Sequence, residues 1–219
     1  MTKAFLLSAL VLAAVACDSN TSGTEASSTD TTHVQHDAGG HTTDTTASSN
    51  VMKASMDSMM MAMHTIKPTG NNDVDFANMM IAHHQGAVNM SKLLVEKGSN
   101  AILEEFAQKV ITDQEKEIAV MKRFADNANP AASSTSADFQ KAMNQSMMAM
   151  MNAKTTVHNQ ADKDYAAQMI PHHQSAVDMA KAYLQYGKDP ILNSLCQGIV
   201  NAQSTEIDWL TEWLERQTL

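Results

Sequence analysis

Residues 80–90 read M-I-A-H-H-Q-G-A-V-N-M, and residues 169–179 read M-I-P-H-H-Q-S-A-V-D-M. The two strings share the pattern M-I-x-H-H-Q-x-A-V-x-M at a separation of 89 residues. Each string places two adjacent imidazoles between thioethers, and these two ligand types together favour copper. The duplication therefore bears both on how the fold is built and on where its chemistry lies.

The similarity between the two strings extends well beyond them. Residues 73–124 align with residues 162–213 without a gap, and 19 of these 52 positions are identical. Upstream, the Met-rich residues 56–63 match residues 143–150. Self-similarity over such a distance is the signature of a structural repeat. We therefore expect two copies of one structural unit.

Composition predicts an all-α protein. Methionine, with 18 residues, favours helix, as do alanine and leucine, and runs of β-branched residues are scarce. We expect a helical bundle of two tandem repeats, each with a Met-rich helix and an antiparallel helical hairpin. The first repeat covers 51–126, a linker covers 127–137 and the second repeat covers 138–219, with both repeats in one domain. The net charge of -9 argues against a nucleic-acid partner.

The first sixteen residues are typical of an export signal, with a basic residue at Lys3 and a short apolar run. The run ends in Ala14-Val15-Ala16-Cys17, which resembles the bacterial lipobox. We expect cleavage before Cys17, lipidation of Cys17 and attachment to a membrane, in the periplasm or at the cell surface. An ordinary secretory signal is the alternative.

Residues 17–50 are rich in Ser, Thr, Asp and Gly and have few large apolar side chains. Such a segment cannot bury enough surface to offset the entropy of ordering, so it is predicted to be a flexible tether. It contains His33, His36 and His41 among acidic residues. Their number is compatible with weak metal capture and equally with chance, and the sequence leaves this open.

The histidine-bearing segments are predicted to be helices with defined ends. Asp73 and Asp162 are candidate N-caps, and Gly98 and Gly187 lie where C-terminal glycines end helices. Another helical pattern starts directly after each glycine, so each pair of helices forms a tight hairpin.

Helical spacing divides the adjacent histidines between two neighbouring faces. His83 shares one inward face with Met80 and Met90, while His84 lies on the next face. The second repeat has the same phasing, with His172, Met169 and Met179 on one face and His173 on the next.

The hairpins suggest partners for these histidines. Gln114 and Glu117 occupy inward positions of the following helix, and burying a carboxylate without a partner is costly. Because His83 and this pair lie about equally far from the hairpin turn, we expect them to be in contact. The same reasoning pairs His172 with Gln203 and Glu206.

The Met-rich helices give a separate signal. Methionine covers more than one face, since Met59, Met60 and Met61 are consecutive. A core seam alone does not require this arrangement, and neutral thioethers suit Cu(I). We therefore expect copper ligands in or beside these helices: Met56, Met60, Met63, His64, Met147, Met150 and His158.

The combination of D-x-D-[FY]-A, M-I-x-H-H-Q-x-A-V-x-M and Q-x-x-E-I over roughly residues 51–215 resembles the domain-of-unknown-function family 305. The resemblance implies an exported, ferritin-like helical bundle with copper-binding relatives. It implies metal ligands at Met80, His83, His84, Met90, Met121, Met169, His172, His173 and Met179, supported by Gln114, Glu117, Gln203 and Glu206. Leu210 stands where the first repeat has Met121, so we expect the two copies of the cluster to be unequal.

These observations predict an extracytoplasmic protein that binds copper, as Cu(I), Cu(II) or both, for buffering, resistance or transfer. Zinc on the histidines is an alternative metal. We expect no enzyme, because no catalytic motif is visible. Two other functions compete: a structural or interaction bundle whose His–Glu pairs fix packing, and a di-metal oxidase, whose E-x-x-H motifs are lacking. Copper-handling partner proteins, a homo-oligomer and the number of sites are left open.

Overall fold

The computed structural model describes residues 46–128 and 131–217, with side chains from residue 51 onward. Within these ranges there are six α-helices and no strand. The predicted all-α helical bundle is confirmed. The helices are α1 (Thr46–Thr65), α2 (Asn72–Lys97), α3 (Ala101–Asn127), α4 (Ser136–Met151), α5 (Ala161–Tyr186) and α6 (Pro190–Arg216).

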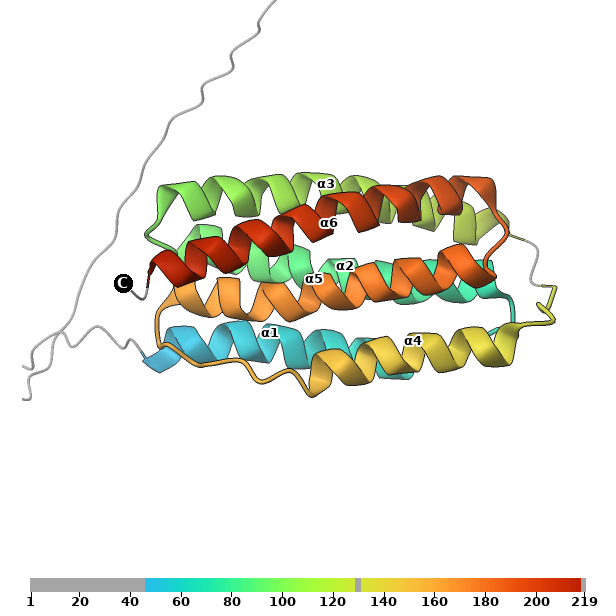
Figure 1. Ribbon diagram of the computed structural model, residues 1–219, viewed down its shortest axis with the longest axis horizontal. Helices are drawn as coiled ribbons and strands as arrows, with labels where there is room; N and C mark the ends of the chain where they lie inside the picture. Colours follow the sequence, from blue (N-terminus) through green and yellow to red (C-terminus); the bar gives the residue numbers. More distant parts are fainter. Residues whose placement is uncertain (1–45, 129–130, 218–219) are drawn as a thin grey trace, which may run out of the picture. The chain divides into compact units, whose positions relative to one another are not determined.

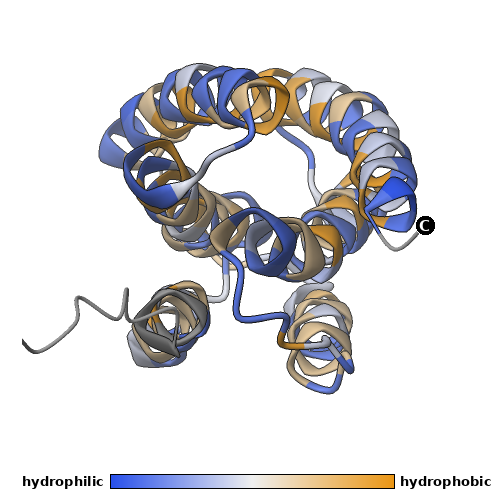
Figure 2. Ribbon diagram, turned by 90° about the vertical axis from the view of Figure 1, so that its left-hand side faces the viewer, coloured by the Kyte–Doolittle hydropathy of each residue, from blue (hydrophilic) through white to orange (hydrophobic). Residues whose placement is uncertain are grey.

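The helices lie in three layers of two, with α3 and α6 in one, α2 and α5 in the next, and α1 and α4 in the third (Figure 1). The end-on view in Figure 2 shows α1 and α4 on the same side of the other four helices and well apart from each other. The helices α2 and α3 pack as one hairpin, α5 and α6 as another, and α2 also packs against α5. The middle layer is therefore covered on both sides.

The first helix begins earlier than predicted. Its start at Thr46 lies inside the segment 17–50 that was expected to be a tether. No proline or glycine separates Thr46 from the Met-rich residues, so a helix formed there extends toward the N-terminus at little cost. The signal segment, Cys17 and the three histidines of the predicted tether lie outside the described residues.

The ends of the middle-layer helices agree with the sequence on one side only. The C-caps of α2 and α5 are Gly98 and Gly187, as predicted. Their N-caps are Asn71 and Gln160, two residues before the predicted aspartates. In α2 the Asn71 side chain accepts hydrogen bonds from two backbone N–H groups of the first turn, as an N-cap does.

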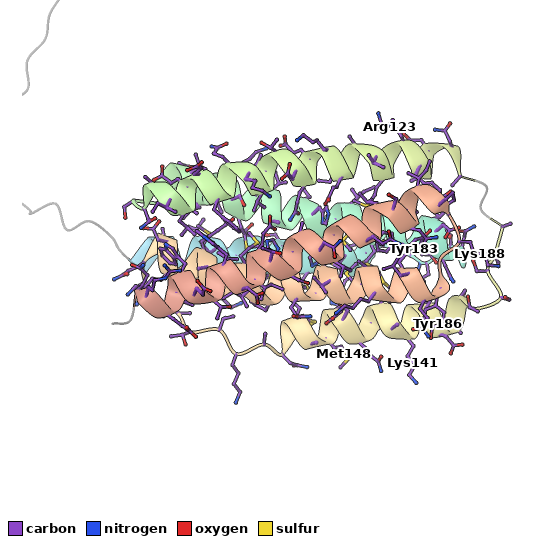
Figure 3. All side chains as sticks on the ribbon, turned by 45° about the horizontal axis from the view of Figure 1, so that its top comes forward. Arg123, Lys141, Met148, Tyr183, Tyr186 and Lys188 are labelled. Carbon is purple, nitrogen blue, oxygen red and sulfur yellow. The ribbon has the colours of Figure 1, made fainter. Side chains whose placement is uncertain are left out.

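The two aspartates that were predicted as caps instead fasten the opposite hairpin. Asp73 of α2 accepts hydrogen bonds from the Tyr183 hydroxyl at 2.6 Å and from the Lys188 backbone N–H at 2.9 Å. Both donors lie at the turn between α5 and α6, where Figure 3 labels them. Asp162 of α5 accepts from the Ser99 backbone N–H and hydroxyl in the turn between α2 and α3. These reciprocal bonds hold the two halves in register.

The inward faces predicted for the two middle-layer helices are buried. The residues of these faces, and those that continue them along each helix, have no exposed surface: Phe76, Met80, His83, Ala87, Met90 and Leu94 of α2, and Tyr165, Met169, His172, Ala176, Met179 and Tyr183 of α5. Among the described helices, none is both long and apolar enough to cross a membrane.

Replacing Asp73 by alanine is expected to lower the free energy of unfolding by about 1–3 kcal/mol, because the buried Tyr183 hydroxyl loses its acceptor. Urea denaturation followed by circular dichroism measures the change. Asp208→Ala, at an exposed position of α6, is the matched control and should stay within about 0.5 kcal/mol. Equal effects of both changes would contradict the proposed fastening role.

Candidate metal centre

Four histidines meet in the middle layer with no exposed surface: His83 and His84 of α2, and His172 and His173 of α5. We call this group the histidine centre. The rings of His83 and His172 lie against each other across the two helices, with centroids 3.9 Å apart. The two sequence motifs therefore build one joint cluster. Each of the other two rings lies about 6 Å from its chain neighbour, at 6.3 Å for His84 and 6.0 Å for His173.

The carboxylates of the outer helices contact the second histidine of each motif, which corrects the predicted pairing. His84 Nε2 lies 2.7 Å from Glu117 Oε2, and His173 Nε2 lies 3.2 Å from Glu206 Oε2. The hairpin arithmetic gave the correct level along the helices but named His83 and His172. Counting residues from the turn gives the position of a residue along the helix axis but not the direction of its side chain around that axis. Adjacent helix residues point about 100° apart.

A methionine that was not predicted as a ligand contacts the central pair. The Met59 Sδ atom of α1 lies 3.2 Å from His172 Nε2, which also lies 3.1 Å from the His83 carbonyl oxygen. The Met59 side chain lies directly over Gly86 of α2, so closely that any side chain at position 86 would collide with its sulfur. Gly86, the residue after H-H-Q, is therefore what lets the thioether reach the histidines.

The sequence did contain a signal for this contact. In the alignment of the Met-rich segments, Met59 falls opposite Ser146, and Gly86 falls opposite Ser175. In the second half these two serines bond to each other, with Ser146 Oγ donating to the Ser175 carbonyl at 2.8 Å. The paired departure from the repeat marks the place where only the first half provides a thioether.

Many polar atoms of this cluster are buried without a hydrogen-bond partner, which is rare in folded proteins. Both ring nitrogens of His83 have none, and His173 Nε2 approaches Glu206 without hydrogen-bond alignment. The other such atoms are Nδ1 of His84, His172 and His173, and Oε1 of Gln114 and Gln203. Each unpartnered atom costs free energy, so the group has the donor atoms that a bound ion would satisfy.

The central imidazoles are uncharged. Burial, followed by the neighbouring His84 and His173, holds the pKa of His83 well below its usual value. Burial and the three other histidines do the same for the pKa of His172. Neutral imidazole is the form that ligates metals, so neither ring has to lose a proton on binding.

The other predicted core ligands are buried but are not brought into one site by any contact described above. These are Met63, Met80, Met90, Met121, Met147, Met169 and Met179, all packed in the core cluster. Leu210 is completely buried, as is its counterpart Met121. Cys196 is a buried free thiol whose pKa is raised by burial and by Glu117.

A second group of predicted ligands gathers at the surface, in the space between α1 and the end of α4. A cleft of about 390 Å³ there is lined by Met56, Met60, Met61, His64, Met150 and Met151, among others. We call it the Met-lined cleft. It also reaches Pro171, the residue before His172. Two of its methionines, Met61 and Met151, were not predicted. His158 lines a neighbouring hollow that shares Pro171 with the cleft.

Within the described residues, no three His, Cys, Asp or Glu side chains converge closely enough to hold a metal ion. In the histidine centre, the Met59 thioether lies beside His172 of the central pair.

The family model described as "Domain of unknown function (DUF305)" matches residues 19–125 and 73–214. The chain belongs to this family. The crystal structure of a DUF305 fragment from Deinococcus radiodurans is 21% identical to this chain with a TM-score of 0.50. The match covers 68% of this chain and 99% of the fragment. It supports the fold. An uncharacterized protein, L153, of Acanthamoeba polyphaga mimivirus is 36% identical over 58 residues, which span 26% of this chain and 38% of that protein.

The chain is also similar to solved structures of CopM. The Cu(I)-bound form of CopM is 30% identical with a TM-score of 0.51, covering 66% of this chain and 96% of CopM. The Ag-bound form obtained by soaking is 29% identical with a TM-score of 0.51, covering 66% of this chain and 95% of CopM.

Gly86→Ala is expected to destabilise the protein by about 1–3 kcal/mol, because the new methyl group overpacks the site that Met59 occupies. Gly198→Ala in α6 is the matched control, since a side chain there meets nothing within 4 Å. That control should stabilise by up to about 1 kcal/mol, the usual helix preference for alanine. Chemical denaturation of both variants measures the difference, and stabilisation by both would refute the packing argument.

Stability is expected to fall as the pH drops below about 6.5, the ordinary histidine pKa. The unfolded chain then binds protons that the folded His83 and His172 refuse, because their folded pKa values are depressed. Each histidine adds a slope of up to about 1.4 kcal/mol per pH unit. Urea denaturation between pH 7.5 and 5.5 tests this against His83→Gln/His172→Gln, whose profile should be flatter.

Proposed function

We propose that this protein binds copper outside the cytoplasm, at an ion site formed by His83, His172 and Met59. The observation that carries the proposal is the neutral pair of adjoining histidine rings, with a thioether 3.2 Å from His172 Nε2 and with buried polar atoms around it that lack partners. The family relationship and the similarity to CopM in its Cu(I)-bound form support it.

The chemistry of these donors favours copper over zinc. Structural zinc sites use four ligands drawn from Cys, His and carboxylates, and no three such side chains converge in the described residues. Imidazole combined with a soft, neutral thioether is suited to Cu(I). Copper therefore fits the centre better than the zinc alternative.

The carboxylates act on the centre through the flanking histidines. Glu117 accepts a hydrogen bond from His84 Nε2–H, and this places the lone pair of the ring on Nδ1. That nitrogen is buried and has no partner, so the tautomer fixed by Glu117 leaves a donor atom ready for metal. Carboxylates commonly orient ligating histidines in this way. Glu206 has the corresponding place beside His173.

The Met-lined cleft is a second proposed binding site, at the surface. Its thioethers and His64 border a cleft open to solvent, in contrast to the fully buried centre. Thioethers are suitable for Cu(I) outside the cytoplasm because they do not form disulfides. An ion held there would lie next to Pro171 and the histidine that follows it.

The proposed location and anchoring rest on the sequence. A signal over residues 1–16 and a lipid on Cys17 would hold the protein at a membrane, with the segment up to α1 as a tether. Buffering of copper, resistance to it, or its transfer to copper-handling partner proteins all fit such a place, as does a homo-oligomer.

Binding without catalysis is the proposed activity. A di-metal oxidase of the ferritin type needs about four glutamates and two E-x-x-H motifs in the bundle core. Glu117 and Glu206 are the glutamates that contact the histidine centre in the described residues. A purely structural function is the competing proposal, and the 2.7 Å contact between His84 and Glu117 favours it.

Copper binding is tested with the full chain purified in detergent and titrated with Cu(I) against a competing chelator. We expect His83→Ala/His172→Ala to lose the buried ion and Met59→Leu to bind it more weakly. Glu117→Gln should weaken binding by about 10–100-fold, as for other residues that orient ligands. His64→Ala/His158→Ala is the matched control and should keep the buried ion.

The outcomes separate the proposals. A parent protein that retains no copper against a modest chelator would overturn the copper proposal. Unchanged copper content in His83→Ala/His172→Ala, together with lower stability, would support the structural function. Oxygen consumption by the iron-loaded protein would support the oxidase.

A further inference from the structure

The outer helices α3 and α6 face each other across a seam, and side chains close one end of it. Phe106 of α3 stacks on Trp209 of α6, with ring centroids 4.6 Å apart and planes within 7°. One turn further along α3, Lys109 Nζ lies 3.0 Å from Glu206 Oε1 of α6. An aromatic pair and an ion pair therefore cover this end of the seam, above His173.

The other end of the seam keeps the glutamate, as Glu117, but has smaller residues at the three other corresponding positions. At the repeat distance of 89 residues, Leu195 replaces Phe106, Val120 replaces Trp209 and Gly198 replaces Lys109. These three residues line a hollow of about 580 Å³, together with Glu117 of α3 and further residues of α6. A side chain added at Gly198 would meet nothing within 4 Å. We call this the open hollow.

The carboxylate in the open hollow, that of Glu117, contacts one histidine of the histidine centre. The Glu117 side chain is 22% exposed and contacts His84, which has no exposed surface. His84 lies next to His83 in the centre, with its Nδ1 unpartnered. At the closed end Glu206 is only 13% exposed, and its two oxygens face Lys109 and His173.

We propose that the open hollow is the port through which a metal ion reaches the histidine centre, and that Lys109 closes the equivalent route at the other end. The inference rests on the proposed metal site and adds the route to it. A carboxylate between apolar walls attracts cations, whereas an ammonium group in the same place repels them. Partial burial opposes the charge of Lys109, but hydrogen bonds to Glu206 and Asp113 raise its pKa, so it stays protonated.

The Met-lined cleft is the competing route, because it reaches Pro171 beside His172. The two routes approach the centre from opposite layers, the open hollow between α3 and α6 and the cleft between α1 and α4. Substitutions in one route therefore leave the other intact, and the two can be tested separately.

The test is Gly198→Lys, which places an ammonium group beside Glu117 as Lys109 stands beside Glu206. The full chain is used with Cys196→Ala, which removes a free thiol that would capture soft ions; alanine already occupies the matching position 107. Ag(I) is mixed with the protein, free ion is removed at set times and bound metal is counted. Uptake at the centre is the part lost with His83→Ala/His172→Ala.

We expect Gly198→Lys to slow uptake at the centre by about tenfold or more, with the final amount of bound ion unchanged. Gly198→Ala should load at the parent rate, and slowing by Gly198→Gln would support the port through filling of the hollow. Lys109→Gly combined with Gly198→Lys should recover the rate, because it opens the other end. Gly198→Lys also replaces a helix-interior glycine, so folding is favoured.

Parent-rate loading of Gly198→Lys would overturn the port, and slowing by Met60→Leu/Met150→Leu in the same assay would assign the route to the Met-lined cleft. These results leave the metal site itself in place. If the parent protein takes up no ion that depends on His83 and His172, the metal site fails and the port fails with it.

Discussion

The burial of four imidazoles between α2 and α5 is the constraint on which the rest of the structure depends. A charged group at that depth costs several kcal/mol or more, so the central rings must be neutral and the surrounding residues must adapt to them. The close contact of His83 with His172 requires the two middle helices to approach each other. The covering layers on both sides then keep water from the rings, and the carboxylates of the outer helices lie where they contact the flanking histidines.

Much of this fold could be predicted because the relevant signals are local. The spacing of apolar residues identified the buried stripe of α2 and α5, and Gly98 and Gly187 identified their ends. Two predictions failed because they depend on how helices are rotated and docked. The distance from the hairpin turn gave the level of Glu117, but rotation decided that it contacts His84. Asp73 fastens a hairpin 110 residues away, which no rule for a single helix end includes.

In the candidate site too, the local motif could be predicted from the sequence, whereas the way the helices dock could not. Both histidine pairs were evident as a repeated motif, whereas the sequence could not decide between one site and two. Contact between His83 and His172 favours one shared centre on the border of the two halves. Met59 could not be predicted from what the two halves have in common. Its significance lies in a difference, since the second half has Ser146 and Ser175 where the first has Met59 and Gly86.

Unequal substitutions in two equivalent halves have a physical consequence. Two identical halves meeting at a shared centre would present identical surroundings on both sides, and an ion there would have no preferred side. Met59 gives a sulfur to one side only, and Lys109 closes the outer seam on one side only. The soft donor therefore comes from the layer of α1, while the open carboxylate comes from the layer of α3. The unequal substitutions thereby distinguish the two halves, because both the thioether beside His172 and the more exposed carboxylate beside His84 belong to the first half.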